Sequence, residues 1–223
     1  MDSAPLPDPG GEAAQLLHAL RHALADPLSA AALKLDLVER RLLSPSGADP
    51  AWVLERVRVL QADVGAATRL LGLLPRLAAI ADERAENASL RDVCLVAGVS
   101  LPKAAGAVPR LMLRRASLAD AIRSVASFAT GHDGAAPPMG HEGLENGRVT
   151  LSLEGTRGTA DGRPARLLDL PHGSEDAEAL FVARAVAVAD GGRLELTERS
   201  GSVVATFSWP LRPGGESGRE GAR

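Results

Sequence analysis

The sequence predicts an α+β protein with two parts: an antiparallel helical hairpin over residues 12–82 and a small two-layer α/β sandwich over residues 83–212. Two observations predict the hairpin. Apolar residues recur at alternating intervals of three and four along two long stretches, and a Ser-Pro-Ser-Gly loop separates these stretches. A third observation predicts the sandwich, because the end of the chain combines an aliphatic helix with short apolar strands and glycine-containing turns.

The first helix is expected over residues 12–43, after a lead-in at 1–11 that is rich in Pro, Gly and Asp and is expected to be disordered. It carries an apolar heptad row that only Arg21 interrupts: Leu17, Leu24, Leu28, Ala31, Leu35, Val38 and Leu42. Pro27 lies inside this helix, where it removes a backbone N–H and crowds the carbonyl of Ala23, at a cost of about 3 kcal/mol. A proline at such a position indicates that a kink there serves a purpose.

The second helix is expected to begin at Asp49-Pro50, which combines an N-cap acid with a proline at the first helical position. Its heptad row is Val53, Val57, Leu60, Val64, Ala67, Leu71, Leu74 and Ala78. Pro75 should end or kink this helix near Leu74, although the apolar pattern continues to Ile80. Two such helices joined by a short loop form an antiparallel hairpin.

Further apolar residues widen the stripe on both helices beyond one row: Leu16, Leu20, Leu33, Leu37, Leu54, Leu70, Leu73 and Leu77. A lone hairpin would leave half of each apolar surface in water. We therefore expect a two-fold homodimer in which two hairpins form a four-helix bundle. The alternative is a hairpin that packs only on the rest of its own chain.

The charged segment 81–87 is expected to link the two parts of the chain. Residues 90–99 fit either a short helix or a strand, because periodicity does not distinguish the two in so short a run. The remaining expected elements are a strand at 108–113, a helix at 118–129, a loop at 131–140, a β-hairpin with the tight turn Asn146-Gly147, a helix at 175–189, a turn at 190–192, strands at 193–197 and 203–209, and a disordered tail at 213–223. Side chains expected to face inward are Leu118, Ile122, Val125, Phe128, Val149, Leu151 and Leu153.

Composition narrows the class of protein. The 223-residue chain has a formal net charge of -3, so it shows no basic footprint for nucleic acid. Cys94 is the only cysteine, which excludes an internal disulfide and suits a reducing compartment. No apolar run approaches the roughly 20 residues that cross a bilayer, and the N-terminus lacks a signal-peptide pattern. We therefore expect a cytoplasmic protein that binds neither nucleic acid nor membrane.

The segment 21–28 contains the pattern His-x-Leu-x-x-Pro-Leu, which resembles the phosphoacceptor box of the sensor histidine kinases. His22 lies about 200° round the helix from Leu24, off the heptad row, and should point into water. In that family the histidine nitrogen takes a phosphoryl group from ATP and passes it to an aspartate of a response regulator. The resemblance implies that His22 is the phosphoacceptor. Arg21, beside it, is a candidate for neutralising the arriving phosphoryl oxygens.

Two positions depart from the family pattern. Ala23 replaces the acid that usually follows the histidine, and Asp26 replaces the usual Thr or Asn four residues after it. A carboxylate beside the imidazole would fix its tautomer and take its proton, so the chain lacks that auxiliary base. The predicted site therefore consists of His22, Arg21 and Asp26.

The C-terminal segment LFVARAVAVADGGRLELTERSGSVVATFSWPL is similar to the end of the histidine kinase catalytic and ATP-binding domain. In that domain an aliphatic helix ends in a Gly-Gly turn, and two strands follow. The resemblance extends over residues 14–211, and it implies that the α/β sandwich resembles the histidine kinase ATPase domain.

Each motif that would hold ATP and magnesium is altered in this chain. Ser124 and Phe128 stand where the family's asparagine box has asparagines, and Phe cannot coordinate Mg²⁺. At the family's Asp-x-Gly-x-Gly motif this chain has Glu-Gly-Thr-Arg-Gly, residues 154–158, so only the last glycine and a longer acid remain. Ala177 and Ala179 replace glycines before the final helix, and neighbouring acids would repel a triphosphate. We therefore expect no ATP, Mg²⁺ or other cofactor.

Other candidate residues have simpler interpretations. His18 lies one turn before His22 but has no proline five residues on, so we interpret it as a polar surface residue. Neither metal-ligand spacing nor a hydrolase motif surrounds His132, His141, His172, Ser174 and Ser200.

Three functions remain open from the sequence. The first, which we favour, is a dimeric histidine phosphotransferase of a two-component phosphorelay. In it His22 exchanges phosphoryl groups with the receiver domain of a response regulator, and the degenerate second domain serves as a docking surface. The second is an ATP-dependent histidine kinase that lacks a sensor domain. The third is a non-catalytic pseudokinase that binds a receiver or another kinase.

Overall fold

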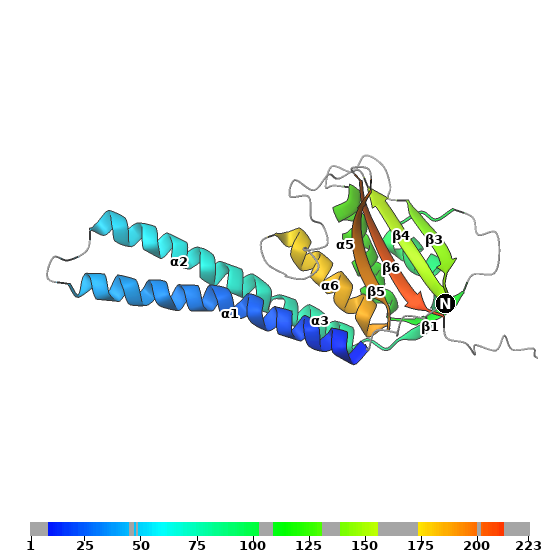
Figure 1. Ribbon diagram of the computed structural model, residues 1–223, viewed down its shortest axis with the longest axis horizontal. Coiled ribbons are helices and arrows are strands. Elements are labelled where there is room, and N and C mark those ends of the chain that lie inside the picture. The colour runs from blue at the N-terminus through cyan, green and yellow to red at the C-terminus, as the bar shows by residue number, and fades with distance from the viewer. Residues whose placement is uncertain are drawn as a thin grey trace, which may run out of the picture.

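The computed structural model describes residues 9–44, 47, 49–102, 109–130, 139–155, 174–199 and 202–211. A long helical hairpin extends to one side of an α/β domain (Figure 1). The predicted fold class is confirmed, because an antiparallel helical hairpin precedes a small two-layer α/β sandwich within one α+β chain. The pairing of two hairpins into a four-helix bundle stays a prediction.

Helix α1 (Pro9–Leu42) forms the first arm of the hairpin and keeps Pro27 inside it. Residues 9–11 are helical, so the prediction that the disordered lead-in extends to residue 11 is wrong for these three. A proline is well suited to the first helical position, because its φ is preset and its missing N–H would have no partner there. Residues 1–8 lie outside the described part of the chain.

Helix α2 (Pro50–Leu71) begins as predicted, with the Asp49 side chain accepting the N–H of Ala51 at 3.0 Å. The break that Pro75 was expected to cause near Leu74 occurs earlier, at Gly72, and α3 (Leu73–Asp82) continues beyond it. Pro75 therefore lies in the first turn of α3, where a backbone N–H has no intrahelical acceptor and its loss has no cost.

Burial on the two arms of the hairpin follows the predicted heptad rows only at Ala31 and Ala67. The side chains buried in the hairpin are Leu16, Leu20, Ala23, Ala31, Ala67, Leu70, Leu73 and Ile80. Most of the predicted heptad rows is instead exposed: Leu17, Leu28, Leu35, Leu42, Val57, Val64, Leu71 and Leu74. Between the arms, Lys34 donates to Asp63 in a partly buried ion pair, a polar contact of the kind that fixes helix register.

By length and composition alone, the helical stretch Pro50–Asp82 could span a membrane. The expectation that no apolar run approaches that length is therefore wrong for this stretch. Only 22% of its most apolar 18-residue segment is buried in the structure, and core helices of soluble proteins can be equally long and apolar. In this fold the stretch is one arm of a hairpin and carries Asp63, which is paired with Lys34.

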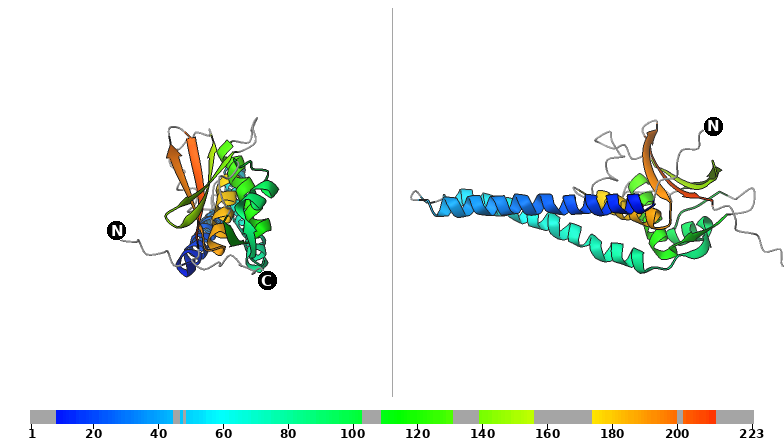
Figure 2. Two further views of the ribbon diagram at one scale, coloured as in Figure 1. Left: turned by 90° about the vertical axis from the view of Figure 1, so that its right-hand side faces the viewer. Right: turned by 60° about the horizontal axis from the view of Figure 1, so that its bottom comes forward.

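The α/β domain contains one antiparallel sheet in the order β3-β4-β6-β5, whose strands are β3 (Gly140–Glu145), β4 (Arg148–Gly155), β6 (Ser202–Pro210) and β5 (Arg193–Arg199). Helices α5 (Arg115–Thr130) and α6 (Glu175–Ala189) cover one face of it (Figure 2). The predicted turn between β3 and β4 is confirmed, because Asn146 and Gly147 have φ values of 51° and 71°, as a type I′ turn requires. The bounds of α6 are those predicted, and all side chains predicted to face inward are buried.

A second, two-stranded sheet pairs β1 (Glu86–Ser89) with β2 (Arg110–Leu113), and α4 (Leu90–Ala97) contacts α5. The ambiguous segment 90–99 is thus helical over residues 90–97, because Ser89 accepts the N–H of Asp92 and Gly98 ends the helix at φ 77°. Glu86 and Asn87 belong to β1 and not to a linker. Most of the loop predicted at 131–140 and all of the tail predicted at 213–223 lie outside the described part of the chain, which omits residues 131–138 and 212–223. Residue 108, where a strand was predicted to begin, is also outside it.

The hairpin and the α/β domain share one hydrophobic core. Leu16, Leu20 and Ala23 of α1 belong to the same buried cluster as Leu180 and Phe181 of α6. Helices α1 and α3 both contact α6, which lies between the hairpin and the sheet (Figure 1). An ion pair between Arg69 of α2 and Glu178 of α6, at 3.7 Å, extends this contact. The two predicted domains are therefore packed against one another.

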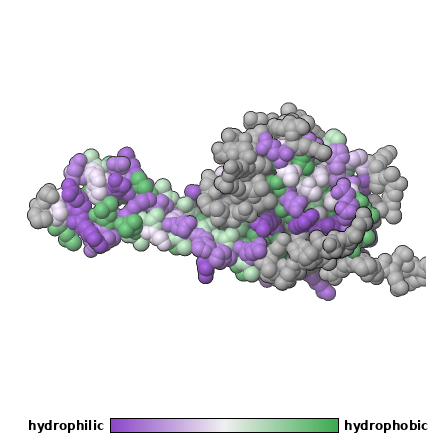
Figure 3. All heavy atoms as spheres, in the orientation of Figure 1, coloured by the Kyte–Doolittle hydropathy of each residue, from purple (hydrophilic) through white to green (hydrophobic). Residues whose placement is uncertain are grey.

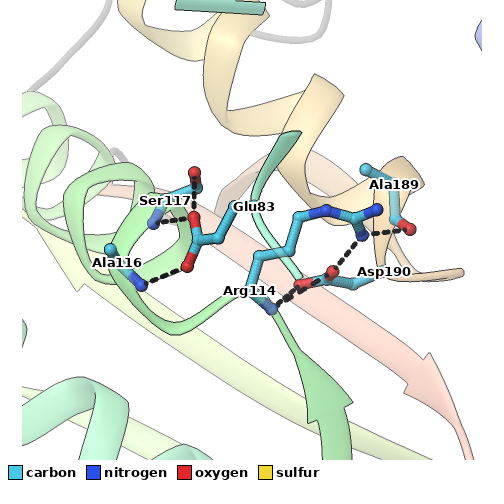
Figure 4. Close-up of polar contacts among 6 residues, drawn as sticks. All are labelled: Glu83, Arg114, Ala116, Ser117, Ala189 and Asp190. Carbon is cyan, nitrogen blue, oxygen red and sulfur yellow. Dashed lines mark hydrogen bonds and ion pairs between the residues drawn. The ribbon is translucent and has the colours of Figure 1, made fainter. Parts of the chain in front are cut away.

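A polar cluster joins the end of the hairpin to the α/β domain (Figure 4). Glu83, which follows α3, accepts the backbone N–H groups of Ala116 and Ser117 and the Ser117 hydroxyl at 2.5 to 2.9 Å. Beside it, Arg114 donates to the fully buried carboxylate of Asp190 at 2.8 Å. Burial raises the pKa of Asp190, and the hydrogen bonds and charge of Arg114 offset this only in part. Burial would also raise the pKa of Glu83, but the hydrogen bonds from Ser117 and Ala116 and the charge of Arg114 together lower it.

Glu83→Gln should lower the free energy of unfolding by about 1 kcal/mol at pH 7, because it weakens a cap on α5. The pKa of Glu83 is lower in the folded protein than its ordinary value of 4.5. Its contribution is therefore complete above pH 4.5 and is lost as the pH falls through the folded pKa. Urea unfolding of the wild type and the variant, at pH 7 and at a pH below the folded pKa of Glu83, measures the difference in their free energies of unfolding. Glu86→Gln is the matched control, since Glu86 forms only an exposed pair with Arg115 and should change little.

Candidate functional site

His22 lies on the exposed face of α1, as predicted. At 100° per residue, its side chain projects about 160° away from that of buried Leu20 and about 120° away from that of exposed Leu28. It therefore points away both from the contact between α1 and α2 and from the exposed heptad row. A second protein can reach this imidazole without displacing either helix.

The other two predicted site residues are also exposed, but neither contacts His22 through a hydrogen bond or ion pair. Arg21 places Nη2 at 3.4 Å from Nδ1 of His18. Asp26 lies one turn beyond His22, and no polar contact joins the two residues. The structure thus brings Arg21 to the histidine face of α1 and leaves Asp26 as a solvent-facing acid.

His18 is exposed, as predicted, but it is also a neighbour of His22. The two ring centroids are 4.5 Å apart and the ring planes meet at 74°, in an edge-to-face arrangement. The sequence places His18 one turn before His22 and predicts a polar surface residue, without a role beside His22. The spacing of four residues along one helix is the signal from which the ring contact itself could have been predicted.

Ala23, the residue that replaces the family's acid, has 2% of its surface exposed. It lies in the cluster that α1 shares with α6. A glutamate at this position would carry its charge into an apolar contact, which costs several kcal/mol without a partner. The missing acid and the docking of the α/β domain on α1 are therefore structurally linked.

Two of the positions that would hold a nucleotide, Phe128 and Ala177, are apolar and buried. Phe128 has 2% of its surface exposed and belongs to the core. A Cβ on Gly155 would lie 1.8 Å from the carbonyl oxygen of Ala129, so the end of β4 packs directly on the backbone at the end of α5. Glu154 is exposed, and residues 156–158 lie outside the described part of the chain.

The N-terminus of α6 is organised as an ordinary helix start. Ser174 accepts the N–H of Ala177, which is itself buried, and Ala179 is half-buried. The first turn carries Glu175, Asp176 and Glu178, whose charges favour the positive end of the helix dipole. These charges would repel a triphosphate at the same place. Ser174 is thus a capping residue.

The remaining candidates do not form a second site. Cys94 is buried, and burial together with the nearby charge of Glu142 raises its pKa to about 12, so it is a thiol and a poor nucleophile. His141 is exposed on β3, while His132, His172 and Ser200 lie outside the described residues. Within the described ranges, no three His, Cys, Asp or Glu side chains are grouped as metal ligands would be.

No protein-family model and no curated protein sequence matches the chain. Solved structures similar to it include the histidine kinase AdeS of Acinetobacter baumannii, with 14% identity over 86% of this chain and 98% of that chain and a TM-score of 0.46. The histidine kinase domain of the E. coli osmosensor EnvZ is 15% identical over 63% of this chain and 97% of its own, with a TM-score of 0.45. The ATP binding domain of PrrB from Mycobacterium tuberculosis is 16% identical over 59% of this chain and 100% of its own, with a TM-score of 0.46.

Proposed function

We propose that the protein is a cytoplasmic histidine phosphotransferase of a two-component phosphorelay, in which His22 exchanges a phosphoryl group with an aspartate of a receiver domain and no ATP is used. One contrast supports this proposal. His22 is exposed within a retained phosphoacceptor box, whereas Phe128 and Ala177, at nucleotide positions, are buried and apolar. The phosphoacceptor segment around His22 is retained, and the segments that would bind ATP are altered.

The proposed chemistry needs little from the protein beyond an accessible imidazole. A ring nitrogen of His22 attacks the phosphorus of the receiver's aspartyl phosphate, an N–P bond forms, and the P–O bond to the aspartate breaks. The carboxylate leaves, and the proton of the neutral ring stays on the other nitrogen. In-line positioning and the Mg²⁺ held by the receiver lower the barrier. The guanidinium of Arg21 reaches His18, the neighbour of His22, and can be offered to the phosphoryl oxygens from there.

In this proposal the α/β domain is a fixed neighbour of the hairpin. Its packing on α1 through Ala23 and the polar cluster around Glu83 both favour a single relative position. A kinase domain that delivers ATP to a histidine has to move toward it. A docking surface for a receiver gains from being held in place.

We further propose that two copies of the chain pair through the exposed heptad rows of the hairpin. Most of the large apolar side chains of both rows are exposed in the single chain, and both rows repeat with the period of a helical bundle. Figure 3 shows hydrophobic patches among hydrophilic ones along this hairpin. A second hairpin presents the complementary rows, so a two-fold dimer covers both at once.

The test is to mix the purified protein with a receiver domain phosphorylated on aspartate and to measure acid-labile phosphate on the protein. We expect transfer within minutes from the receiver and none from ATP with Mg²⁺. Label acquired from ATP would support the kinase alternative. Absence of label with stable binding of the receiver would support the pseudokinase alternative. Phe128→Asn should not restore labelling from ATP, because Ala177 and Ala179 remain.

A further inference from the structure

The ring of His18 is the one side chain in aromatic contact with His22 among the described residues. The two rings lie on successive turns of α1, with centroids 4.5 Å apart and planes at 74°. Edge-to-face contacts of this kind are favourable because the positive ring edge meets the negative ring face. An exposed side chain without contacts samples several rotamers, so the ring of His18 narrows the orientations open to His22.

His22 depends on this ring contact for its orientation, because no carboxylate next to it fixes the imidazole. Ala23 carries no carboxylate and is buried, and no described residue forms a hydrogen bond with His22. A contact through the ring face or edge leaves both ring nitrogens of His22 without a hydrogen bond. One nitrogen can then attack phosphorus while the other retains its proton.

His18 also anchors the neighbouring cation. Nη2 of Arg21 lies 3.4 Å from Nδ1 of His18, within reach of a hydrogen bond that the guanidinium donates. A neutral His18 that accepts at Nδ1 carries its proton on Nε2. Arginine side chains on exposed helix faces are otherwise mobile. The anchor therefore holds a guanidinium on the face of α1 where the phosphoryl group would arrive.

We infer that His18 is a positioning residue for phosphoryl transfer to His22: its ring orients the imidazole of His22 and its Nδ1 anchors Arg21. This inference rests on the proposed function for the reaction itself, but not for the ring contact. The two parts of the role can be separated by substitution. His18→Phe keeps an aromatic ring and removes the acceptor, His18→Gln keeps an acceptor and removes the ring, and His18→Leu removes both.

The experiment measures two quantities on the full chain. Nuclear Overhauser contacts between the ring protons of residues 18 and 22 report the orientation of His22 without any phosphoryl chemistry. The initial rate of His22 phosphorylation is measured with potassium phosphoramidate, which requires no cognate receiver, and with a phosphorylated receiver domain. Ser29→Leu is the matched control, because Ser29 is exposed on the same face two turns away.

We expect ring contacts in the wild type and in His18→Phe. We expect a rate at least about tenfold lower in His18→Leu and smaller losses in His18→Phe and His18→Gln, with Ser29→Leu unchanged. A rate for His18→Leu within about twofold of wild type, or the absence of ring contacts in the wild type, would overturn the inference. Wild type that reacts with phosphoramidate but not with any receiver would refute the phosphorelay function and leave the positioning role standing.

Discussion

His22→Ala is expected to abolish acid-labile phosphorylation, lowering the label acquired from a phosphorylated receiver domain by at least about 100-fold. Alanine removes the nitrogen nucleophile, and the substitution removes no buried contact that stabilises the fold. His22 is exposed, and alanine has the highest helix propensity, so α1 should be as stable as before. Circular dichroism of the variant checks that the fold is intact, and phosphate release in acid identifies the labelled group.

The control for this variant is His18→Ala, which should slow labelling without preventing it. Label retained by His22→Ala and lost from His18→Ala would identify His18 as the phosphoacceptor. Label on neither variant nor on the wild type would leave only the interaction function. Both variants are needed because the two imidazoles are neighbours on one helix face. A measurement of phosphate on the whole chain does not identify which of the two histidines carries it.

The hairpin was predictable from the sequence because its signals are local. Asp49-Pro50 starts α2, and heptad spacing identifies both arms. In the sheet, the local pair Asn146-Gly147 likewise predicts the turn between β3 and β4. The row that each arm buries was not predictable. Apolar residues occupy adjacent rows on α1, so periodicity fixes the helix but not which row contacts α2. Leu20, outside the predicted heptad row, is buried, whereas Leu28 within it is exposed.

The exposure of His22 followed from its angle to the heptad row, because both the exposed and the buried rows lie on the far side of the helix. The burial of Ala23 did not follow, since it depends on α6, more than 150 residues away in the sequence. Glu83 was predicted to lie in a charged linker for the same reason. Its partners, Ala116 and Ser117, are brought to it only by the tertiary fold.

Leu35→Asp is expected to convert a dimer into a monomer. Leu35 lies in the exposed heptad row of α1 and is 55% exposed in the single chain. In a two-fold four-helix bundle it is buried against the partner hairpin, where an unpaired carboxylate costs about 3 kcal/mol or more. That cost raises the dissociation constant by at least about 100-fold. Light scattering at micromolar concentration should give twice the chain mass of 23.1 kDa for the wild type and the chain mass for the variant.

Leu33→Asp is the matched control, because Leu33 is 70% exposed, lies on the same helix and faces the side of His22 rather than the heptad row. It should leave the dimer intact. Leu60→Asp is less informative, since Leu60 is half-buried in its own chain and its substitution would weaken the hairpin as well. A wild type that is monomeric at micromolar concentration would refute the four-helix bundle, and a dimer lost through Leu33→Asp but kept by Leu35→Asp would place the interface on the histidine face. That second outcome would also hide His22 from any receiver, so the oligomeric state tests the proposed function as well as the assembly.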